Sequence, residues 1–579
     1  KGEDKGDYDL STAPSIIIYI CKEDDNLWDI AKKYNTTEEE IAQTNEISID
    51  EELQPGKCLI LEKKVAQFRC TTRIGDALER FVQPVIKWRK RECYQQLYDY
   101  IYGDVSDRVF ILYGLRRTGK TTLIRQLIAD MDMAMKSKSV FIQIQDTKIL
   151  DDVNQDLRIL EEKGYRYIFI DEVTLLNDFI EGAALFSDVF AASGMKIVLS
   201  GTDSLGFMFT EDEELYDRCI MCHTTFIPYR EFENVLGIVG IDNYIQYGGT
   251  MSLSGKRYND NAQIFSSKKN TDEYVDSAIA RNIQHSLKNY EYADHFRSLR
   301  DLYEKNELTN AINRIVEDIN HRFTIEVLTR EFQSSDLRIS AGNLRKDKKA
   351  PTDILDRIDI SKVNETLKSL LEIKDKEERK IEIQDSHRFE IKEYLDLLDL
   401  TVDIETRWMS DYNRKEARTA FSQPGIRYSQ AESLIKSLMQ DDKFRDLSLV
   451  ERKRVTERIL AEIKGRMMED IVLLETKLSK KNCEVFRLQF AIGEFDMVVF
   501  DPEVETCEIY EIKHSDKIVL QQCRHLLDKQ KCEDTAFRYG TIIGKYVIYR
   551  GATTSLVQAG VSTQEDVAYL NVEEYLKKL

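Results

Sequence analysis

Two glycines that bracket four residues, followed by a lysine and two threonines, are the first feature of the sequence that could do chemistry. The segment reads ILYGLRRTGKTTLIRQL, an apolar strand pattern, then a turn, then a helical pattern. Backbone N–H groups of such a turn, with the positive end of the following helix, can hold a triphosphate. Lys120 would contact the β- and γ-phosphates, and the Thr121 hydroxyl would bind Mg²⁺. The predicted ATP-binding residues of this segment are Gly114, Thr118, Gly119, Lys120, Thr121 and Thr122.

A second apolar strand pattern, YRYIFIDEV, ends in two adjacent carboxylates, Asp171 and Glu172. In enzymes with a phosphate-binding turn of this kind, the first carboxylate supports Mg²⁺, and the second can orient and deprotonate the attacking water. The pair therefore predicts hydrolysis of ATP and not only its binding. A further apolar strand pattern ends in LSGTDS, where Ser200 and Thr202 are candidates to sense the γ-phosphate.

Residues near the end of the chain form a second group with chemical potential. In CEIYEIK, the period of two that strands follow places Glu511 and Lys513 on one face. The preceding strand pattern, GEFDMVVF, carries Asp496 near its start, and Glu469 lies on a long helical pattern one turn after Gly465. Carboxylates that converge on one point repel each other unless a cation neutralises them. The group therefore predicts a divalent-metal site with Asp496 and Glu511 as ligands.

The order of these residues resembles the core of PD-(D/E)xK nucleases. In that family the Asp and the second Glu hold Mg²⁺, the lysine positions or activates water, and the helical Glu supports the metal shell. The resemblance implies DNA as a partner and Glu469, Asp496, Glu511 and Lys513 as catalytic residues. An inactive nuclease-like fold and ordinary surface charges stay open as alternatives. His514, beside the lysine, is interpreted as a bystander and not as a metal ligand.

The elements that must position these residues divide the chain into units. Apolar strand patterns alternate with helical patterns from about Val105 to Gly237, which predicts a parallel sheet with helical crossovers. Helical spacing from Phe68 to Tyr102 adds leading helices, and residues 238–410 are mostly helical. Residues 411–579 begin with a long helix and continue with strands. The predicted fold class is multidomain α/β, with a P-loop ATPase core, a helical middle region and a C-terminal restriction-endonuclease-like domain.

Four segments, GLRRTGKTTL, IFIDEV, IVLSGTDS and DRCIMCHTTFIPYREF, resemble a group of prokaryotic AAA-type ATPases with a helical region and a C-terminal nuclease-like domain. The resemblance runs from about Phe68 to the end and implies an ATPase domain at 68–237 and a homo-oligomer. It implies an arginine finger at Arg218, for which a surface salt bridge is the alternative. The segment Tyr274–Leu287 fits the family's helical part, so residues 238–410 are expected to contain a lid and a winged-helix-like unit.

Residues 1–15 are a polar tail, and residues 16–64 read as a separate small unit with a strand, two helical patterns and a second strand entered through QPG. This unit resembles a LysM module. The matching residues are Leu27, Trp28, Ile30, Ala31, Tyr34, Ile41, Asn45, Leu53, Pro55, Gly56 and Leu59. LysM modules bind chitin or peptidoglycan sugars, but Asp24 and Asn26 replace the usual glycine and threonine of the first turn. A glycan and a protein therefore both stay open as its partner.

Composition limits the partners further. At 579 residues the chain is too long for one core. A formal net charge of −20 means that nucleic acid has to bind at a local basic face, for which Lys87–Glu92, Arg345–Lys349 and Arg452–Arg458 are candidates. Ten cysteines scattered along the chain favour a reducing cytoplasm over a disulfide framework or a zinc site. No apolar stretch approaches the roughly 20 residues of a membrane span.

The favoured hypothesis is an ATPase whose nucleotide state controls a metal-dependent DNA nuclease, and the combination of domains suggests prokaryotic defence against phage or mobile DNA. The alternative is a nucleotide-switched scaffold, in which the LysM-like module recruits a partner and the C-terminal domain binds without cutting. Both hypotheses require Lys120. Only the first requires Lys513.

Overall fold

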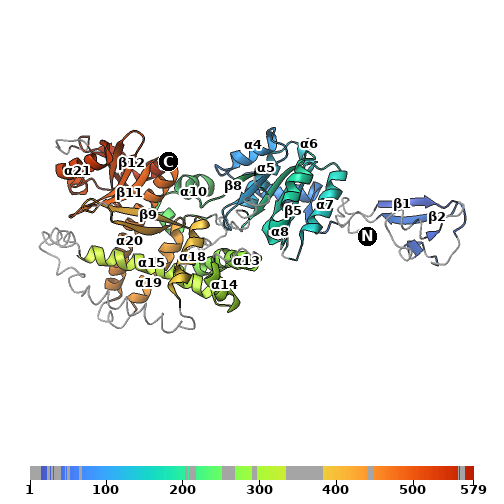
Figure 1. Cartoon of the computed structure of the whole chain (residues 1–579), viewed down its shortest axis with the longest axis horizontal. Helices are drawn as coiled ribbons and strands as arrows, with labels where there is room; N and C mark the ends of the chain where they lie inside the picture. Colours follow the sequence, from blue (N-terminus) through green and yellow to red (C-terminus); the bar gives the residue numbers. More distant parts are fainter. Residues whose placement is uncertain are drawn as a thin grey trace, which may run out of the picture.

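The computed structural model arranges the strands in three separate sheets of two, six and eight strands (Figure 1). The structure describes residues 15–22, 26–27, 30, 41–42, 44–45, 47–48, 53–63, 68–145, 147–176, 178–202, 207, 215, 217–250, 268–289, 296–333, 383–411, 413–440, 448–558, 560 and 567–579. The chain is thus a multidomain α/β protein. Within its described part, no helix has both the length and the apolar character that crossing a bilayer demands.

The six-stranded sheet has the order β3-β5-β6-β7-β4-β8. Its strands are β3 (Thr71–Arg73), β4 (Val109–Tyr113), β5 (Ser139–Gln143), β6 (Tyr167–Asp171), β7 (Lys196–Gly201) and β8 (Cys219–His223). The strands from β4 to β8 pair in parallel, whereas β3 adds an antiparallel edge to β5. The parallel sheet that the sequence predicts is confirmed.

Helices cover both faces of this sheet, because successive strand residues point to opposite sides. Val109 and Ile111 of β4 enter one apolar core together with residues of α7, whereas Phe110 and Leu112 enter the other with residues of α3, α4 and α5. The helices and helical turns of this unit are α3 (Gly75–Val82), η1 (Gln83–Val85), α4 (Tyr94–Tyr102), α5 (Lys120–Asp130), α6 (Met133–Lys136), α7 (Leu150–Glu162), η2 (Val173–Leu175), α8 (Phe179–Gly182) and η3 (Phe186–Ala191).

The N-terminal module is built on an antiparallel pair, β1 (Ser15–Ile20) and β2 (Cys58–Lys63). Its buried apolar residues are Cys21, Leu27, Ile30, Ile41, Leu59 and Leu61. The Asn45 side chain ties the helical part to β2: its amide donates to the carbonyls of Ile41 and Ile60 at 2.8 Å, and its oxygen accepts the Ile60 N–H at 2.6 Å. Asn26 is exposed, and Asp24 lies outside the described residues.

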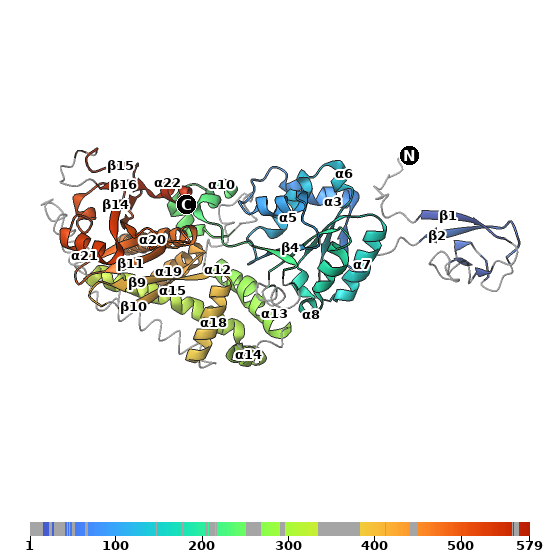
Figure 2. The same ribbon diagram turned by 45° about the horizontal axis from the view of Figure 1, so that its top comes forward.

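The middle of the chain is helical and divides between two cores. Its helices are α10 (Tyr229–Leu236), α11 (Ile241–Tyr247), α12 (Lys268–Tyr274), η5 (Val275–Ala280), α13 (Arg281–Asn289), α14 (Arg297–Glu304), α15 (Leu308–Gln333) and α18 (Asp385–Leu397). Residues of η5, α13, α14, α15 and α18 share one core with Leu115, which follows β4. Residues of α10 and α11 pack instead with the C-terminal unit, and both ribbon views place α10 between the two larger sheets (Figures 1 and 2).

The eight-stranded sheet has the order β10-β9-β11-β12-β13-β14-β16-β15. Its strands are β9 (Thr401–Trp408), β10 (Lys415–Phe421), β11 (Glu484–Gln489), β12 (Glu494–Asp501), β13 (Thr506–Lys513), β14 (Thr541–Tyr549), β15 (Thr554–Ser555) and β16 (Ala568–Asn571). The helices are α19 (Pro424–Leu438), α20 (Leu449–Ser479), η9 (Leu520–Cys523), α21 (Lys529–Tyr539) and α22 (Val572–Lys578). The long helix α20 contacts β11 and β13, and so lies against the strands with the predicted metal ligands.

One boundary differs from the sequence prediction. Strand β9 belongs to the eight-stranded sheet but lies inside residues 238–410, which the sequence predicts to be mostly helical. Ile404 is fully buried in this strand, whereas the neighbouring Asp403 is exposed. The segment TVDIETRW therefore lacks the continuous apolar run that marks the other strands, so its period of two escapes notice.

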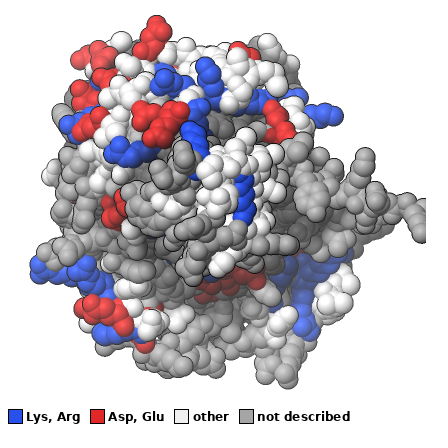
Figure 3. Space-filling model, turned by 90° about the vertical axis from the view of Figure 1, so that its right-hand side faces the viewer, with Lys and Arg blue, Asp and Glu red and all other residues white. Residues whose placement is uncertain are grey.

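The predicted basic faces are only partly available to a nucleic acid. On the face seen in Figure 3, basic and acidic side chains lie interspersed over the described part of the surface. In the segment Lys87–Glu92, Lys90 pairs with Asp130, and Arg91 is buried against Glu231. Residues Arg345–Lys349 lie outside the described residues. Within the segment Lys87–Glu92, only Arg91 is thus withdrawn from the surface, and Lys87, Arg89 and Lys90 are exposed.

Candidate functional site

The glycine turn lies between β4 and α5, at the edge of the sheet where the parallel strands end. Gly114 has a φ of 136°, and a Cβ at this position would lie 2.4 Å from the Thr224 carbonyl oxygen, so only glycine fits. Lys120 is buried, and its Nζ donates to the carbonyls of Gly114 and Leu115 at 2.8 and 2.9 Å. Burial lowers the pKa of Lys120 to about 8, against the opposing effect of two nearby carboxylates. The lysine thus has neutral direct partners and a charge that an anion would stabilise.

Asp171, at the end of β6, joins three elements of this edge. The Thr121 hydroxyl, in the first turn of α5, donates to one Asp171 oxygen at 2.8 Å, and the Ser200 hydroxyl of β7 donates to the other. Carboxylate and hydroxyl oxygens are the ligands that Mg²⁺ takes in proteins, together with waters and substrate phosphates. Thr121 and Asp171 therefore fit the predicted Mg²⁺ position.

Glu172 follows directly, with a left-handed backbone (φ 57°) that turns the chain away from the strand. The Thr202 hydroxyl donates to its carboxylate at 3.2 Å. Burial, with a contribution from Asp171, raises the pKa of Glu172 above its usual range. A carboxylate with a raised pKa is better matched to accepting a proton from water near neutral pH.

Two further predicted threonines differ in their contacts. Thr118 is buried, and its hydroxyl lies 2.8 Å from both the Leu115 carbonyl and the Thr224 hydroxyl. These bonds fix the turn internally. Thr122 is half-buried in the first turn of α5, beside the residues that face the phosphate position.

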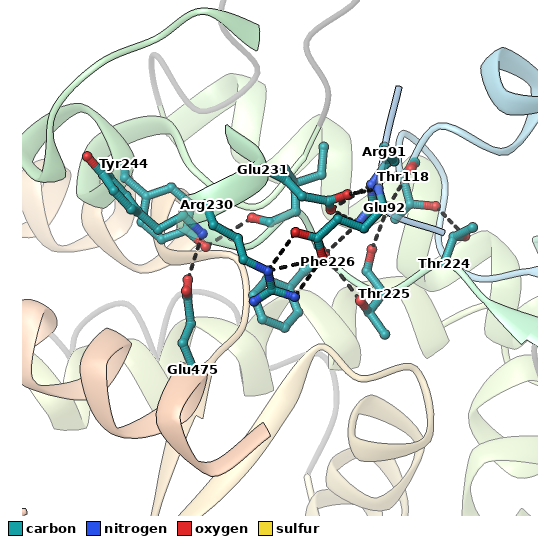
Figure 4. A network of polar contacts seen from close by, with 12 residues as sticks. Arg91, Glu92, Thr118, Thr224, Thr225, Phe226, Arg230, Glu231, Tyr244 and Glu475 are labelled. Carbon is teal, nitrogen blue, oxygen red and sulfur yellow. Dashed lines mark hydrogen bonds and ion pairs between the residues drawn. The ribbon is translucent and has the colours of Figure 1, made fainter. Parts of the chain in front are cut away.

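Arg91 is a residue of this site that the sequence analysis missed, because its segment was interpreted as a basic surface. Its guanidinium is buried; Nη1 donates to the Thr118 carbonyl at 2.8 Å and Nε donates to Glu231 of α10 at 2.9 Å (Figure 4). Glu231 also accepts the Glu92 N–H at 2.6 Å. Arginine and glutamate are 140 residues apart in the sequence. No local pattern indicates such a pair.

The same network reaches the C-terminal unit. The N–H of Tyr229, at the start of α10, donates to Glu475 of α20 at 2.8 Å (Figure 4). On the other side of the turn, Tyr274 donates through its hydroxyl to the Arg116 carbonyl at 3.3 Å, and Asn282 donates to the Thr202 carbonyl. The phosphate-binding edge is thus held both by α10 and by the helical region.

Arg218 lies away from this edge. Its carbonyl accepts the N–H of Val109, where β4 begins, whereas the glycine turn follows the other end of β4. The length of that strand separates them by about 16 Å. The side chain is 47% exposed and pairs with Asp188 at 3.3 Å. Arg218 therefore lies too far away to serve the nucleotide site of its own chain, and its pairing with Asp188 agrees with the salt-bridge alternative.

In the C-terminal unit, Lys513 brings two carboxylates together. Its Nζ lies 2.8 Å from Asp496 and 2.7 Å from Glu511, and both carboxylates are buried. The N–H of Ile512 also donates to Asp496 at 2.8 Å. Antiparallel pairing of β12 with β13 produces this meeting, since Met497 and Tyr510, the adjacent residues, are opposite each other in register.

The electrostatics of this trio are compatible with a divalent cation. Burial raises the pKa of Glu511 well above its usual range, and the Asp496 carboxylate adds to the shift. Burial also opposes ionisation of Asp496, but Lys513 and the Ile512 N–H lower its pKa overall. The Oε1 atom of Glu511 is buried and accepts no hydrogen bond. Two carboxylates, one with an unsatisfied oxygen, fit a Mg²⁺ ion that keeps water and substrate oxygens as its other ligands.

Glu469 lies within electrostatic range of Asp496 and Lys513, whose charges act on its pKa, so the predicted convergence of all four residues stays a prediction. The Glu469 carboxylate pairs with Arg466, three residues earlier on α20, and lies 3.5 Å from Arg487 of β11. Burial raises the pKa of Glu469 to about 7. Among the described residues, no group of three or more carboxylate, histidine or cysteine side chains is placed to hold a metal. Arg466 and Arg487 compete with a metal ion for the Glu469 carboxylate. A helical sequence pattern does not reveal these ion pairs.

Two family models match the chain. The family described as AAA domain matches residues 106–233, and the family described as LysM domain matches residues 19–61. These matches support the prediction of an AAA-type P-loop ATPase domain with an N-terminal LysM module, and the AAA match supports ATP hydrolysis. Neither match extends over the C-terminal unit, so its nuclease-like identity stays a prediction. No curated protein matches the chain.

Solved structures give weak overall likenesses. PCH-2 of C. elegans is 19% identical, with 28% of this chain and 46% of that chain covered and a TM-score of 0.19. The Orc1 protein of Aeropyrum pernix, solved with DNA, is 12% identical, with 63% and 98% covered and a TM-score of 0.20. The Hsp104–ADP complex of S. cerevisiae is 12% identical, with 70% and 52% covered and a TM-score of 0.19. At these scores none of the three carries weight for the fold or function of this chain.

Proposed function

We propose that the chain is an ATPase whose nucleotide state controls Mg²⁺-dependent cleavage of DNA in its C-terminal unit. The observation that carries the proposal is the meeting of two buried carboxylates, Asp496 and Glu511, with the half-buried Lys513, and the unsatisfied oxygen of Glu511. The order helix α20, strand β12, strand β13 agrees with the resemblance to PD-(D/E)xK nucleases. Cleavage of phage or mobile DNA is the setting that this combination of domains suggests.

At the nucleotide site, each residue has a role that follows from its position. Lys120 stabilises the β- and γ-phosphates, and Thr121 with Asp171 would hold Mg²⁺ against them. Glu172 orients and deprotonates the attacking water, and the Thr202 hydroxyl keeps its carboxylate in place. Arg218 of a neighbouring copy would supply the positive charge that a phosphoryl transition state needs. The site is therefore completed in a homo-oligomer.

At the C-terminal site, Asp496 and Glu511 would hold Mg²⁺, which supplies Lewis-acid stabilisation of a scissile phosphate when bound. Two carboxylates keep the pKa of Lys513 well above its usual range, although burial opposes its charge. Lys513 would position the attacking water and stabilise the charge that develops on the phosphate oxygens, while the proton of the water leaves to solvent or to a phosphate oxygen.

The two sites communicate through α10 in this proposal. Arg91 joins the glycine turn to Glu231 of α10, and Tyr229 of the same helix contacts Glu475 of α20. A change in the conformation of the glycine turn between nucleotide states would therefore be transmitted to α20, which packs against β11 and β13. We infer that ATP acts on the timing of cleavage and not on its chemistry.

A second candidate is the nucleotide-switched scaffold with a C-terminal unit that binds without cutting. It is favoured by the finding that Lys513 already pairs with both carboxylates and that Glu469 pairs with arginines. In that case ATP changes assembly, and the LysM module recruits a glycan or protein partner.

Incubation of labelled duplex and single-stranded DNA with the purified chain, with Mg²⁺ or Mn²⁺, separates the two candidates. We expect cleavage by the wild type and its loss in Lys513→Ala and Asp496→Ala, while ATP hydrolysis stays within about twofold of wild type because the two sites use separate chemistry. Ser555→Ala, in the same domain, is the control. Cleavage that survives Lys513→Ala undiminished would assign the activity elsewhere and favour the scaffold.

A further inference from the structure

Asp242 of α11 sits among three basic side chains of the C-terminal unit. Its carboxylate lies 2.9 Å from His514 Nε2, 3.3 Å from Arg550 Nη1 and 3.9 Å from Lys464 Nζ. Asp242 is 35% exposed, and the three partners are between 12% and 32% exposed, so this cluster is neither a free surface nor a sealed core. The cluster is called the Asp242 pocket below, after the residue that fills it.

The Asp242 pocket borders the proposed DNA-cleaving trio. His514 follows Lys513 directly in the chain, so their Cα atoms are about 3.8 Å apart. Lys464 lies on α20 next to Gly465, where a Cβ would meet His514 at 3.6 Å, and the helix and the end of β13 therefore approach closely. Because successive strand residues point to opposite faces, a DNA backbone that passed this end of β13 would meet Lys513 on one side and these basic side chains on the other.

A carboxylate and a phosphodiester present the same features to such a pocket, a negative charge and oxygens that accept hydrogen bonds. Arginine, lysine and protonated histidine bind both through charge-assisted hydrogen bonds. We propose that Lys464, His514 and Arg550 form a subsite for a DNA backbone phosphate next to the scissile one, and that Asp242 occupies this subsite in place of DNA. The inference rests on the proposed nuclease function and specifies how its substrate is bound.

The position of Asp242 connects this subsite to the nucleotide site. Helix α11 follows α10, and the two are separated by Gly237 and Gly240, which have positive φ angles of 69° and 100°. The N–H of Ile241 donates to Glu573 of α22 at 3.1 Å, and Lys577 of α22 pairs with Glu233 of α10 at 2.8 Å. Asp242 therefore belongs to the segment that leads from the Arg91–Glu231 contact to the C-terminal unit. Displacement of this segment would uncover the phosphate subsite.

The test is the affinity of the full-length chain for labelled duplex DNA, measured by fluorescence anisotropy without divalent metal, so that no cleavage is needed. Asp242→Asn removes the competing charge at nearly constant volume. We expect it to tighten DNA binding about tenfold at low salt and to steepen the salt dependence by about one phosphate contact. The matched control is Asp516→Asn, which removes the carboxylate that faces Arg550 Nε at 3.3 Å from the more exposed side.

Removal of the basic side chains should reverse the increase in DNA affinity. Arg550→Gln in the Asp242→Asn background should return the affinity to the wild-type value. If Asp242→Asn fails to fold, as judged by its melting curve, the double variant Lys464→Gln/Arg550→Gln replaces it, and we expect DNA binding at least threefold weaker than wild type, since the subsite has lost two of three cations.

The outcomes separate this inference from the proposed function. Equal DNA affinity of wild type, Asp242→Asn and Asp516→Asn, or unchanged affinity of the double variant, overturns the subsite. Tighter binding by Asp242→Asn supports it, and then a lack of cleavage by every variant in Mg²⁺ would remove only the nuclease activity. Cleavage that speeds up in Asp242→Asn, but not in Asp516→Asn, supports both.

Discussion

The molecule has a lysine at each of its two candidate sites, buried at Lys120 and half-buried at Lys513, and their surroundings are opposite. Lys120 contacts the neutral carbonyls of Gly114 and Leu115, and burial lowers its pKa to about 8. Lys513 contacts the carboxylates of Asp496 and Glu511, which hold its pKa well above the usual range against the effect of burial. One lysine therefore has an unbalanced charge, and the other is already balanced.

The two sites therefore differ in how a bound ligand would change their balance of charge. An anionic phosphate supplies Lys120 with the opposite charge that its carbonyl partners do not provide. A divalent cation at Asp496 and Glu511 would instead have to share two carboxylates with Lys513. We therefore expect the nucleotide site to bind its ligand with little rearrangement, whereas the second site requires Lys513 to turn toward the substrate.

The largest effects are expected from two substitutions at the nucleotide site, which act on different steps. Lys120→Ala should weaken ATP binding by about a hundredfold or more, because it removes the phosphate-binding charge, whereas Glu172→Gln should retain binding and slow hydrolysis by about a hundredfold or more. Titration with a fluorescent ATP analogue and a phosphate-release assay measure the two quantities. ATP hydrolysis at the wild-type rate in Glu172→Gln would take the role of base away from that residue.

The two lysines should also differ in their contribution to the free energy of unfolding. Lys513→Met leaves Asp496 and Glu511 buried without a counter-charge and should lower the free energy of unfolding by about 2–4 kcal/mol. Lys120→Met removes an unbalanced buried charge and should leave stability equal or higher. Differential scanning calorimetry of both variants without nucleotide checks the sign. A loss of equal size in both variants would show that the two lysines do not differ in this way.

The third prediction is a pH effect at Lys120. Its pKa of about 8 in the folded chain lies below its usual 10.5, so its burial opposes folding while it is protonated, and this opposition fades as the pH rises from about 8 to 10.5. A bound triphosphate should raise this pKa again, so ATP binding near pH 9 should take up protons and binding near pH 6.5 should not. Calorimetry in buffers of different ionisation enthalpy measures the uptake. Lys120→Arg, which stays charged, should abolish it. Equal uptake in that variant would place the titrating group elsewhere.

The smallest effect is expected at the N-terminal module. Its core is formed by its own residues, and Asn45 ties it together internally. Deletion of residues 1–64 should therefore leave ATP turnover within about twofold of the full chain. Partner capture or assembly, followed by light scattering, should change instead. Saturable binding of the isolated module to peptidoglycan or chitin fragments would contradict a protein-binding role.

Sequence patterns predicted those features of the structure that depend on residues close together in the chain. The glycine turn, the Asp171–Glu172 strand end and the parallel sheet follow from local spacing and from continuous apolar runs. The contacts that the sequence does not reveal join distant segments: Arg91 with Glu231, Glu469 with Arg487, and Asp242 with His514. A charged residue gives the same local pattern whether it is solvated or buried against a partner from another element. The interpretation of Arg91 as surface failed for that reason, and the contact of His514 with Asp242 escaped prediction for the same reason.

Cleavage of labelled duplex DNA in Mg²⁺, with and without ATP, tests most directly whether the two lysine sites act together. The comparison uses wild type, Lys120→Ala and Glu172→Gln, which differ in binding and hydrolysing ATP but share an intact C-terminal trio. We expect ATP to change the cleavage rate of wild type and of Glu172→Gln, and to leave that of Lys120→Ala unchanged. Cleavage that is indifferent to ATP in all three proteins would contradict control of the second site by the first.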